Sequence, residues 1–509
     1  MASPPPNNPQ QGKAPNYVEQ RVLELFEVHG WAVTILALGS CTKLAATREC
    51  VSVQIAVLNS STAISNEACL VLVQQNYRVF YNEPPPLSSV IAPPVTITAE
   101  PLSEFFPYLV TLNKRIEPDK SPALTTSRPK IVKRLVAESP LQSVLSRLEQ
   151  FTSANLAAKL VTRRAAAEEK SLTPDKTKTK ATGIAYLMRN AIDYAFASQT
   201  DQLNKRVVSL YYGSMALAQA EMLAAPSGPA DLDEIENMTK GGHGLYAVPH
   251  PDGGFSALQV GVLATGFLSH WAKFLGKDVS KFPKKRVKSI EELPNLPVNM
   301  SCSLRDLFAS IPEIDDLFAE VFGGTSKWVT VIYDRTSNDF FNAQTYKSTQ
   351  KQQSTYYLFN DESGGLSAEI LQKTNWPLAE IRLADNGSLP GITLKGITFR
   401  ARVDHSGQDR GWDVLPVHSS PFGKRGMLLL PVIGGLSDYR AVAVVTLYAL
   451  SIMARYMPSA WRRIEDGDEN QYLALVKAAL SVWERLLPEQ FLESIAGEQV
   501  STAQPGSWL

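Results

Sequence analysis

Four polar side chains from distant parts of the sequence could together bind an anion. They are Tyr211, Tyr212, His243 and Arg455. The two tyrosines lie in one apolar helical stretch, the arginine ends another, and His243 lies in a loop rich in glycine. If the loop folded over the helices, guanidinium and imidazole groups would supply charge and hydrogen bonds to an anionic ligand. Because a buried Arg or Tyr more often belongs to a satisfied core network, this second interpretation stays open.

A basic run provides a different candidate, a phosphate-binding patch. Residues 277–288, KDVSKFPKKRVK, contain Lys284, Lys285 and Arg286 in succession, and residues 176–180 form a second basic stretch. A patch that contacts phosphates would bind nucleic acid with a steep dependence on salt. A solvated loop is the simpler interpretation. The 50 basic and 50 acidic residues cancel, which argues against a protein that coats nucleic acid over its whole surface.

Recognisable reaction motifs are missing from the sequence. There is no GxSxG, HExxH or GxGxxG pattern, and no Gly-Lys-Ser/Thr ending follows the glycine-rich loop. Arg400 and His405 have the spacing of the HEPN ribonuclease motif, but they lie in a strand-like segment. Residues five apart on a strand face opposite ways, so a chance match is the better explanation. The catalytic residues are therefore unknown, whether the protein is an enzyme is uncertain with the balance against it, and no cofactor is expected.

The acidic and cysteine residues do not predict a metal site. The acidic run of residues 231–236 lacks the spacing of a calcium loop and is typical of an exposed helix start. The four cysteines contain no CxxC pair, and most lie in apolar contexts that favour buried, reduced thiols. Together with an N-terminus that does not resemble a secretory signal, this predicts a cytoplasmic protein.

The long apolar run of residues 427–454 is not expected to cross a membrane. Gly434 and Gly435 interrupt it, and the charges of Asp438 and Arg440 would be costly at the centre of a bilayer. We expect a loop followed by a buried helix over residues 441–456, and no membrane partner. Residues 189–225, whose apolar positions keep a helical period, should pack against that helix.

Periodicity and composition predict an α+β multidomain protein with a small N-terminal α/β domain and a mainly helical body that carries a β-rich insertion. The strand candidates of the insertion are WVTVIYD, STYYLFN, AEIRLAD and GITFRARVD. The expected parts are a disordered tail (1–16), the small α/β domain (17–81), a proline-rich connector (82–140), the helical body (141–326), the β-rich subdomain (327–413) and C-terminal helices that complete the body (414–497).

The small α/β domain is expected to begin with a helix followed by strands at 31–38, 50–58 and 69–81, an order similar to the start of restriction-endonuclease-like folds. Metal-dependent nucleases need carboxylates on such strands, whereas this sequence has Ser52, Gln54, Gln74 and Gln75. We expect a degenerate nuclease-like domain or an unrelated recognition domain.

Several motifs resemble a known family. RVVSLYYGSMALAQAEML, GHGL, SLRDLFASIPEIDDLF and TLYALSIMARYMPSAW follow one another as in the YaaC-like family of bacterial proteins, over roughly residues 141–494. The resemblance implies a mostly helical bacterial protein of unknown activity. Each motif is a packing motif, so the resemblance implies nothing about chemistry.

These observations favour a non-enzymatic intracellular interaction or response module, whose partner is an unknown protein or a second copy of the chain. The alternative is a nucleic-acid-binding or processing factor, with a possible role in defence against phage, which rests on the basic stretches. A third hypothesis is an enzyme acting on a small phosphorylated ligand through Arg455 and His243.

Overall fold

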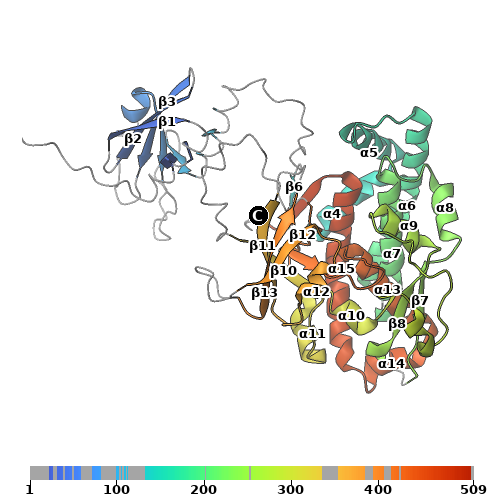
Figure 1. The fold of residues 1–509 in the computed structure, drawn as a ribbon. Helices are drawn as coiled ribbons and strands as arrows, with labels where there is room; N and C mark the ends of the chain where they lie inside the picture. Colours follow the sequence, from blue (N-terminus) through green and yellow to red (C-terminus); the bar gives the residue numbers. More distant parts are fainter. Residues whose placement is uncertain are drawn as a thin grey trace, which may run out of the picture. The chain divides into compact units, whose positions relative to one another are not determined.

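The chain contains two compact units. The computed structural model describes residues 22–23, 25–26, 31–37, 41–48, 51–58, 71–81, 99–102, 105, 108–109, 112, 132–200, 202–251, 254–334, 354–384, 394–405, 414–423 and 426–505. The described residues of the smaller unit lie between 22 and 112, and those of the larger unit between 132 and 505 (Figure 1).

The smaller unit is built on a mixed sheet with the order β1-β2-β3-β4-β5. Its strands are β1 (Ala32–Ala37), β2 (Cys41–Arg48), β3 (Val51–Leu58), β4 (Tyr77–Tyr81) and β5 (Ala99–Pro101). The first three strands pair antiparallel, whereas β4 and β5 add in parallel. Phe105 packs edge-on against Phe26 and Phe80, with ring centroids 5.1 and 5.3 Å apart, and closes the core over one face of the sheet.

Two predictions for this unit need correction. The strand expected over residues 69–81 is shorter, because residues 71–74 are helical and only β4 follows them, and strand β2 was not predicted. Most of the helix expected from residue 17, and the tail before it, lies outside the described residues. Ser52 and Gln54 are exposed on β3, so the positions considered for a nuclease carry neutral side chains that face solvent.

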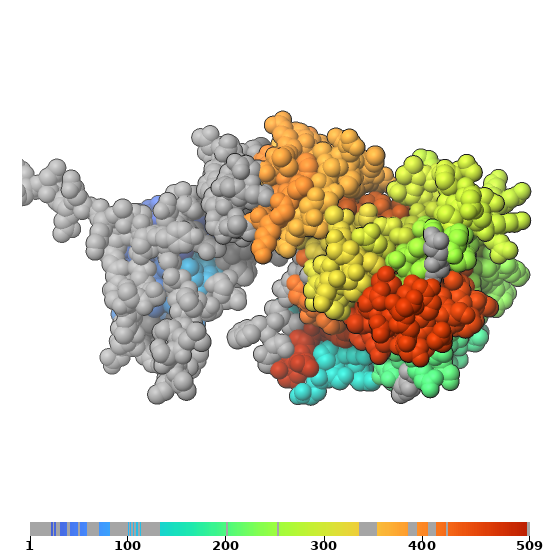
Figure 2. Space-filling model, turned by 90° about the horizontal axis from the view of Figure 1, so that it is seen from below, coloured from blue at the N-terminus to red at the C-terminus, as the bar shows by residue number. Residues whose placement is uncertain are grey.

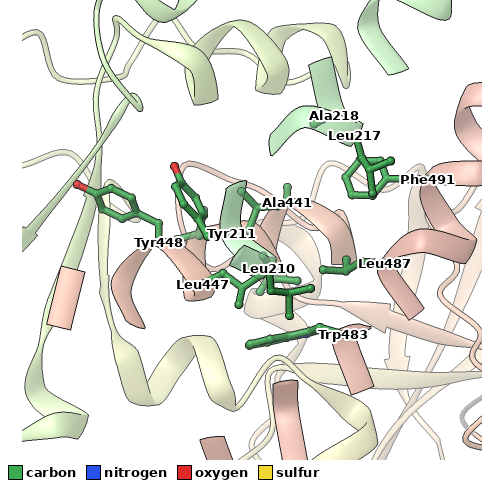
Figure 3. Packing of buried hydrophobic residues seen from close by; sticks show 14 of the residues in the cluster. Leu210, Tyr211, Leu217, Ala218, Ala441, Leu447, Tyr448, Trp483, Leu487 and Phe491 are labelled. Atoms are coloured by element: carbon green, nitrogen blue, oxygen red, sulfur yellow. The ribbon is translucent and has the colours of Figure 1, made fainter. Parts of the chain in front are cut away.

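Helices make up most of the larger unit. They are α4 (Pro140–Glu149), α5 (Ala154–Ala167), α6 (Pro174–Thr200), α7 (Leu203–Ala224), α8 (Leu232–Thr239), α9 (Phe267–Phe274), α10 (Leu304–Phe308), α11 (Asp315–Phe322), α12 (Ala368–Gln372), α13 (Tyr439–Tyr456), α14 (Pro458–Asp466) and α15 (Gln471–Ala496). Helices α7, α13 and α15 are buried along most of their length and form the centre of the unit (Figures 1 and 3). As predicted, α13 is buried in the core beside α7.

The helix boundaries differ from the predicted ones within residues 189–225. The stretch 189–225 is not one helix, because the chain breaks before α7, where Gln202 has an extended backbone. The second basic stretch, residues 176–180, lies in the first turns of α6. No single helix among the described residues is long and apolar enough to span a membrane; α13 and α14 meet the length and composition criteria only as a pair bent by 103°. Figure 2 shows the end of the unit at which α14 lies on the surface.

The β-rich segment forms an antiparallel sheet with the order β12-β13-β11-β10-β14. The four predicted strands are present as β10 (Trp328–Tyr333), β11 (Ser354–Asp361), β12 (Leu378–Leu383) and β13 (Ile397–Asp404). A fifth strand, β14 (Met427–Leu429), comes from the part expected to be a loop before the buried helix and pairs with β10. The sheet has its own core, in which Phe359 and Trp376 stack at 6.2 Å.

Two smaller sheets complete the larger unit. Strands β7 (Leu245–Val248), β8 (Gln259–Val262) and β9 (Ser301–Ser303) form an antiparallel sheet beside α13. Strand β8 is followed by helix α9. The strands β6 (Val132–Val136) and β15 (Gln499–Ala503) pair in parallel, so the first and last described elements of the unit lie side by side.

Candidate functional site

The structure brings together all four residues proposed as an anion site. Tyr211 and Tyr212 lie on α7, Arg455 lies in the last turn of α13, and His243 lies in the loop between α8 and β7. The Tyr211 hydroxyl is 2.9 Å from Nδ1 of His243, and Nη1 of Arg455 donates to the Tyr212 hydroxyl at 3.1 Å. Tyr448 from α13 joins them, with its ring centroid 5.6 Å from that of His243. We call Tyr211, Tyr212, His243 and Tyr448 the aromatic cluster.

Glycines hold His243 in place. Gly242 and Gly244 have φ angles of 86° and 75°, which residues with a side chain rarely adopt. The carbonyl groups of Gly242 and His243 accept hydrogen bonds from Phe267 and Leu268 in the first turn of α9, at 2.9 and 3.0 Å. A Cβ atom on Gly266 would lie 2.4 Å from the Gly244 nitrogen. The glycine loop therefore packs closely against the start of α9.

The aromatic cluster contains weak acids and a weak base. Burial, and then the charge of Arg455, lower the pKa of His243, whereas burial raises the pKa of the Tyr211 phenol. The Tyr448 hydroxyl donates to the Leu245 carbonyl at 3.0 Å. Figure 3 shows the rings of Tyr211 and Tyr448 side by side at one edge of the core. A neutral imidazole that is hydrogen-bonded to a protonated phenol suits a positioning role and is poorly suited to act as a general acid at neutral pH.

Arg455 connects the aromatic cluster to the surface. Its Nε and Nη2 atoms donate to the carbonyl and the hydroxyl of Ser451, at 3.1 and 3.3 Å. Its guanidinium carbon lies 5.7 Å from the ring centroid of Tyr212 and 5.1 Å from that of Tyr456. Tyr456 is 68% exposed, so the guanidinium lies between a half-buried and an exposed ring.

The predicted basic patch begins near the glycine loop, because Leu263 donates to the Gly244 carbonyl and the next residue, Ala264, donates to Pro283. Lys284, Lys285 and Arg286, which we call the basic loop, are all exposed. The carbonyl of Pro283 accepts a hydrogen bond from the Ala264 nitrogen at 2.8 Å, which anchors the loop just after β8. Burial raises the pKa of Tyr448, and the charges of Arg455 and Arg286 both act against this rise. Arg286 is therefore close enough to Tyr448 for its charge to act on the phenol, which links the basic loop electrostatically to the aromatic cluster.

The other basic stretch is not a free patch. Lys176 and Lys178 are exposed, but Lys180 is only 2% exposed. Its ammonium group donates to the carbonyls of Leu223, Ala225, Gly228 and Pro229, where α7 ends. Burial lowers the pKa of Lys180 to about 8. Lys180 thus caps the C-terminus of α7, and part of the basic stretch that suggested nucleic-acid binding has a structural role.

A known protein family matches the part of the chain that contains the candidate site. The sequence profile of the YaaC-like Protein family matches residues 149–495. The chain belongs to the YaaC-like family. No match was found among curated proteins or among solved structures. The YaaC-like region includes the aromatic cluster, Arg455 and the basic loop, whereas it excludes the smaller unit.

Arg400 and His405, which have the HEPN-like spacing, bind different partners in this YaaC-like protein. Nε of Arg400 donates to Asp334 at 2.6 Å, and its guanidinium lies over the Tyr356 ring. His405 is buried, and its Nε2 lies 2.9 Å from the Thr355 hydroxyl. Each side chain has its own partners, as expected for a chance match.

Sequence analysis missed a buried polar network in the YaaC-like region. His418 lies 2.7 Å from Glu313 through Nε2 and 3.1 Å from the Gln490 amide through Nδ1. The Tyr439 hydroxyl donates to Glu313 at 2.9 Å, and its ring stacks on His418 at 4.0 Å. Burial acts to raise the pKa of Glu313, but hydrogen bonds led by that from His418 outweigh it and lower the pKa. No local pattern marks these residues, because their partners lie far apart in the sequence.

Metal ligands do not gather anywhere in the part of the chain that the structure describes. No group of three or more His, Cys, Asp or Glu residues there could hold a metal ion. Asp231 caps α8 by accepting from the Glu234 nitrogen at 2.9 Å, as expected of a helix start. Cys302 is buried, and burial raises the pKa of its thiol well above the ordinary value.

Proposed function

We propose that this YaaC-like protein is a non-catalytic binding module whose helical body engages an anionic partner. The proposal rests on one observation: Arg455 and Arg286 of the basic loop both act electrostatically on Tyr448 of the aromatic cluster, and Arg455 also donates to Tyr212. Cationic side chains beside accessible aromatic rings suit single-stranded nucleic acid, because the cations contact phosphates and the rings stack on bases.

The arrangement supports stacking at two places. Tyr456 is 68% exposed beside Arg455, and Tyr194 of α6, which is 37% exposed, stacks on Tyr212 with centroids 5.9 Å apart. Both exposed rings therefore contact a part of the site that is fixed by the core. Stacking of a base on an aromatic ring contributes about 1–3 kcal/mol and requires no particular base.

The same geometry makes His243 a poor general acid. Its imidazole is bonded to the buried Tyr211 hydroxyl, and its lowered pKa disfavours the charged form that would act as an acid. We therefore assign Tyr211 and His243 to positioning, and Arg455, Tyr456 and the basic loop to contact with the partner.

The test is binding of labelled oligouridine and oligothymidine to the full-length protein at about 50 and 200 mM salt. We expect binding that weakens with salt and is reduced by Arg455→Ala, by Tyr456→Ala and by charge reversal of the basic loop. Charge reversal of Lys176 and Lys178 serves as the control, because these exposed lysines lie near the C-terminal end of α7, roughly 18 Å along the helix from Tyr211.

Two outcomes would contradict the proposal. A polyanionic partner would be excluded if the affinity for the oligonucleotides did not depend on salt concentration, or if no binding were detected at low salt. Cleavage of the oligonucleotide, abolished by a single polar substitution such as His243→Gln, would show that the site is catalytic. A role in phage defence and a cytoplasmic location remain predictions that these experiments do not address.

A second candidate is association with a protein or with another copy of the chain. It is favoured by Tyr186, Tyr194 and Phe196, three aromatic residues on α6 that are 50, 37 and 43% exposed. Light scattering should then show an oligomer that dissociates in a Phe196→Ser variant. A monomer at micromolar concentration would exclude self-association and leave a different protein as the partner.

A further inference from the structure

A separate cavity of about 350 Å³ lies where the β-rich sheet meets the helical body. The body contributes Lys277, which follows α9, and Ser437, which precedes α13. The β-rich part contributes Trp376 and Leu415, with Asn375 exposed beside them. This size is at the low end of small-molecule sites, which usually measure about 300–1,000 Å³.

Within the part of the chain that the structure describes, the cavity contains a cation, Lys277, that forms no ion pair. Nζ of Lys277 donates to the Ser437 hydroxyl at 3.1 Å, the one hydrogen-bond partner that this ammonium group has within the described ranges. The carboxylate of the neighbouring Asp438 has other partners. It forms an ion pair with Arg440 at 2.9 Å and caps α13 by accepting hydrogen bonds from the Arg440 and Ala441 nitrogens. Burial lowers the pKa of Lys277, although Asp438 acts to raise it. An ammonium group that is partly desolvated without an ion-pair partner favours a bound anion, which offsets that cost.

The walls define the remainder of the ligand. Trp376 and Leu415 are 8 and 6% exposed, and Pro416 and Pro431 also line the cavity. Polar groups form the larger part of the lining and these side chains a smaller apolar part, so the lining suits a ligand that combines a polar group with a small apolar ring or chain. A single ammonium and a single hydroxyl match one carboxylate, whereas a phosphate group carries more charge and usually needs arginine or several backbone nitrogens.

We propose that this cavity, the Lys277 pocket, binds a small organic carboxylate. The carboxylate accepts hydrogen bonds from Lys277 and Ser437, and the apolar part of the molecule lies against Trp376. The pocket is independent of the surface around Arg455, so either proposal stands without the other.

The test uses benzoate, 3-phenylpropionate and indole-3-acetate as probes, each compared with its neutral amide. Binding to the full-length protein is followed by saturation-transfer NMR and by tryptophan fluorescence. We expect at least one carboxylate to bind with a Kd below ~1 mM and at least ~10-fold more tightly than its amide. Trp376→Phe should remove the fluorescence change, because Trp376 lines the cavity.

Variants then locate the binding. Lys277→Met should weaken carboxylate binding by ~10-fold or more. Lys273→Met is the matched control, because Lys273 is exposed in the last turn of α9 and should leave binding unchanged. If Lys277→Met fails to fold, Ser437→Ala replaces it and should weaken binding in the same direction. The proposal is overturned if no carboxylate binds at ~10 mM, if each amide binds as well as its acid, or if the pocket variants bind normally.

Discussion

The hydroxyl group of Tyr211 lies 2.9 Å from Nδ1 of His243, a residue 32 positions further along the chain. This contact ties the central helix α7 to the glycine loop, and it places the imidazole among three tyrosine rings. The loop is held from its other side by the first turn of α9. His243 therefore holds a fixed position in the aromatic cluster, next to the tyrosine that Arg455 contacts.

Acid should destabilise the protein partly through His243. Its pKa in the folded state is lowered from the ordinary 6.5, so the unfolded chain takes up a proton more readily than the folded chain. Stability from this residue is complete well above pH 6.5 and is lost as the pH falls below that value. The Tm of the wild type should therefore fall more steeply than that of His243→Gln between neutral and mildly acidic pH. Equal slopes, with exposed His270→Gln as control, would contradict this.

Removing His418 should weaken the join between the β-rich sheet and the helical body. The side chains of His418 and Glu313 are 3 and 0% exposed, and His418→Ala would leave the Glu313 carboxylate buried without its imidazole partner. Loss of one partner from such a pair costs about 3–5 kcal/mol. Thermal unfolding monitored by tryptophan fluorescence should show a lower Tm and an early transition in the β-rich part. A variant as stable as the wild type would mean that water replaces the imidazole.

Lys180→Met should destabilise the helical body by about 3 kcal/mol, because it removes the ammonium group that binds the carbonyls at the end of α7. The variant keeps a side chain of similar length, so the effect reports hydrogen bonding more than volume. Lys178→Met, on the exposed side of the same helix, should change stability by less than about 0.5 kcal/mol. Urea unfolding of both variants provides the comparison, and equal midpoints would exclude the capping role.

Charge reversal of the basic loop should change the salt dependence of oligonucleotide binding as well as the affinity. Each phosphate contact that is lost lowers the slope of log K against log salt by about 0.7 for a single strand. The variant Lys284→Glu/Lys285→Glu/Arg286→Glu should therefore lower this slope by up to about 2, while Tyr456→Ala should leave the slope unchanged and reduce affinity only. Anisotropy titrations at several salt concentrations separate the two effects.

Strands with a clear local sequence pattern were predicted correctly. Strands β10 to β13 alternate in burial or carry β-branched and aromatic residues. Strand β14 escaped detection, because its three residues are all buried and show no alternation. The break before α7 was missed for a related reason, since Gln202 is neither glycine nor proline and gives no stop signal.

The remaining features of the candidate site depend on contacts between residues that are far apart in the sequence. The grouping of Tyr211, Tyr212, His243 and Arg455 was predicted because each lies in or beside a central element. The neighbourhood of Arg286 and Tyr448 was not predicted, since it depends on the path of the loop after α9. Lys180 looked like a surface lysine because its carbonyl partners lie more than 40 residues away. Nothing in the local sequence distinguishes it from Lys178.

The parallel pairing of β6 with β15 has a consequence for synthesis on the ribosome. Val132–Val136 emerges early, but its partner Gln499–Ala503 is translated about 360 residues later, roughly 20–70 s at ordinary elongation rates. Until then β6 has an open edge that other nascent chains could pair with. Completion of the larger unit therefore has to wait until β15 has been synthesised, and chaperone binding during translation should concentrate on this early strand.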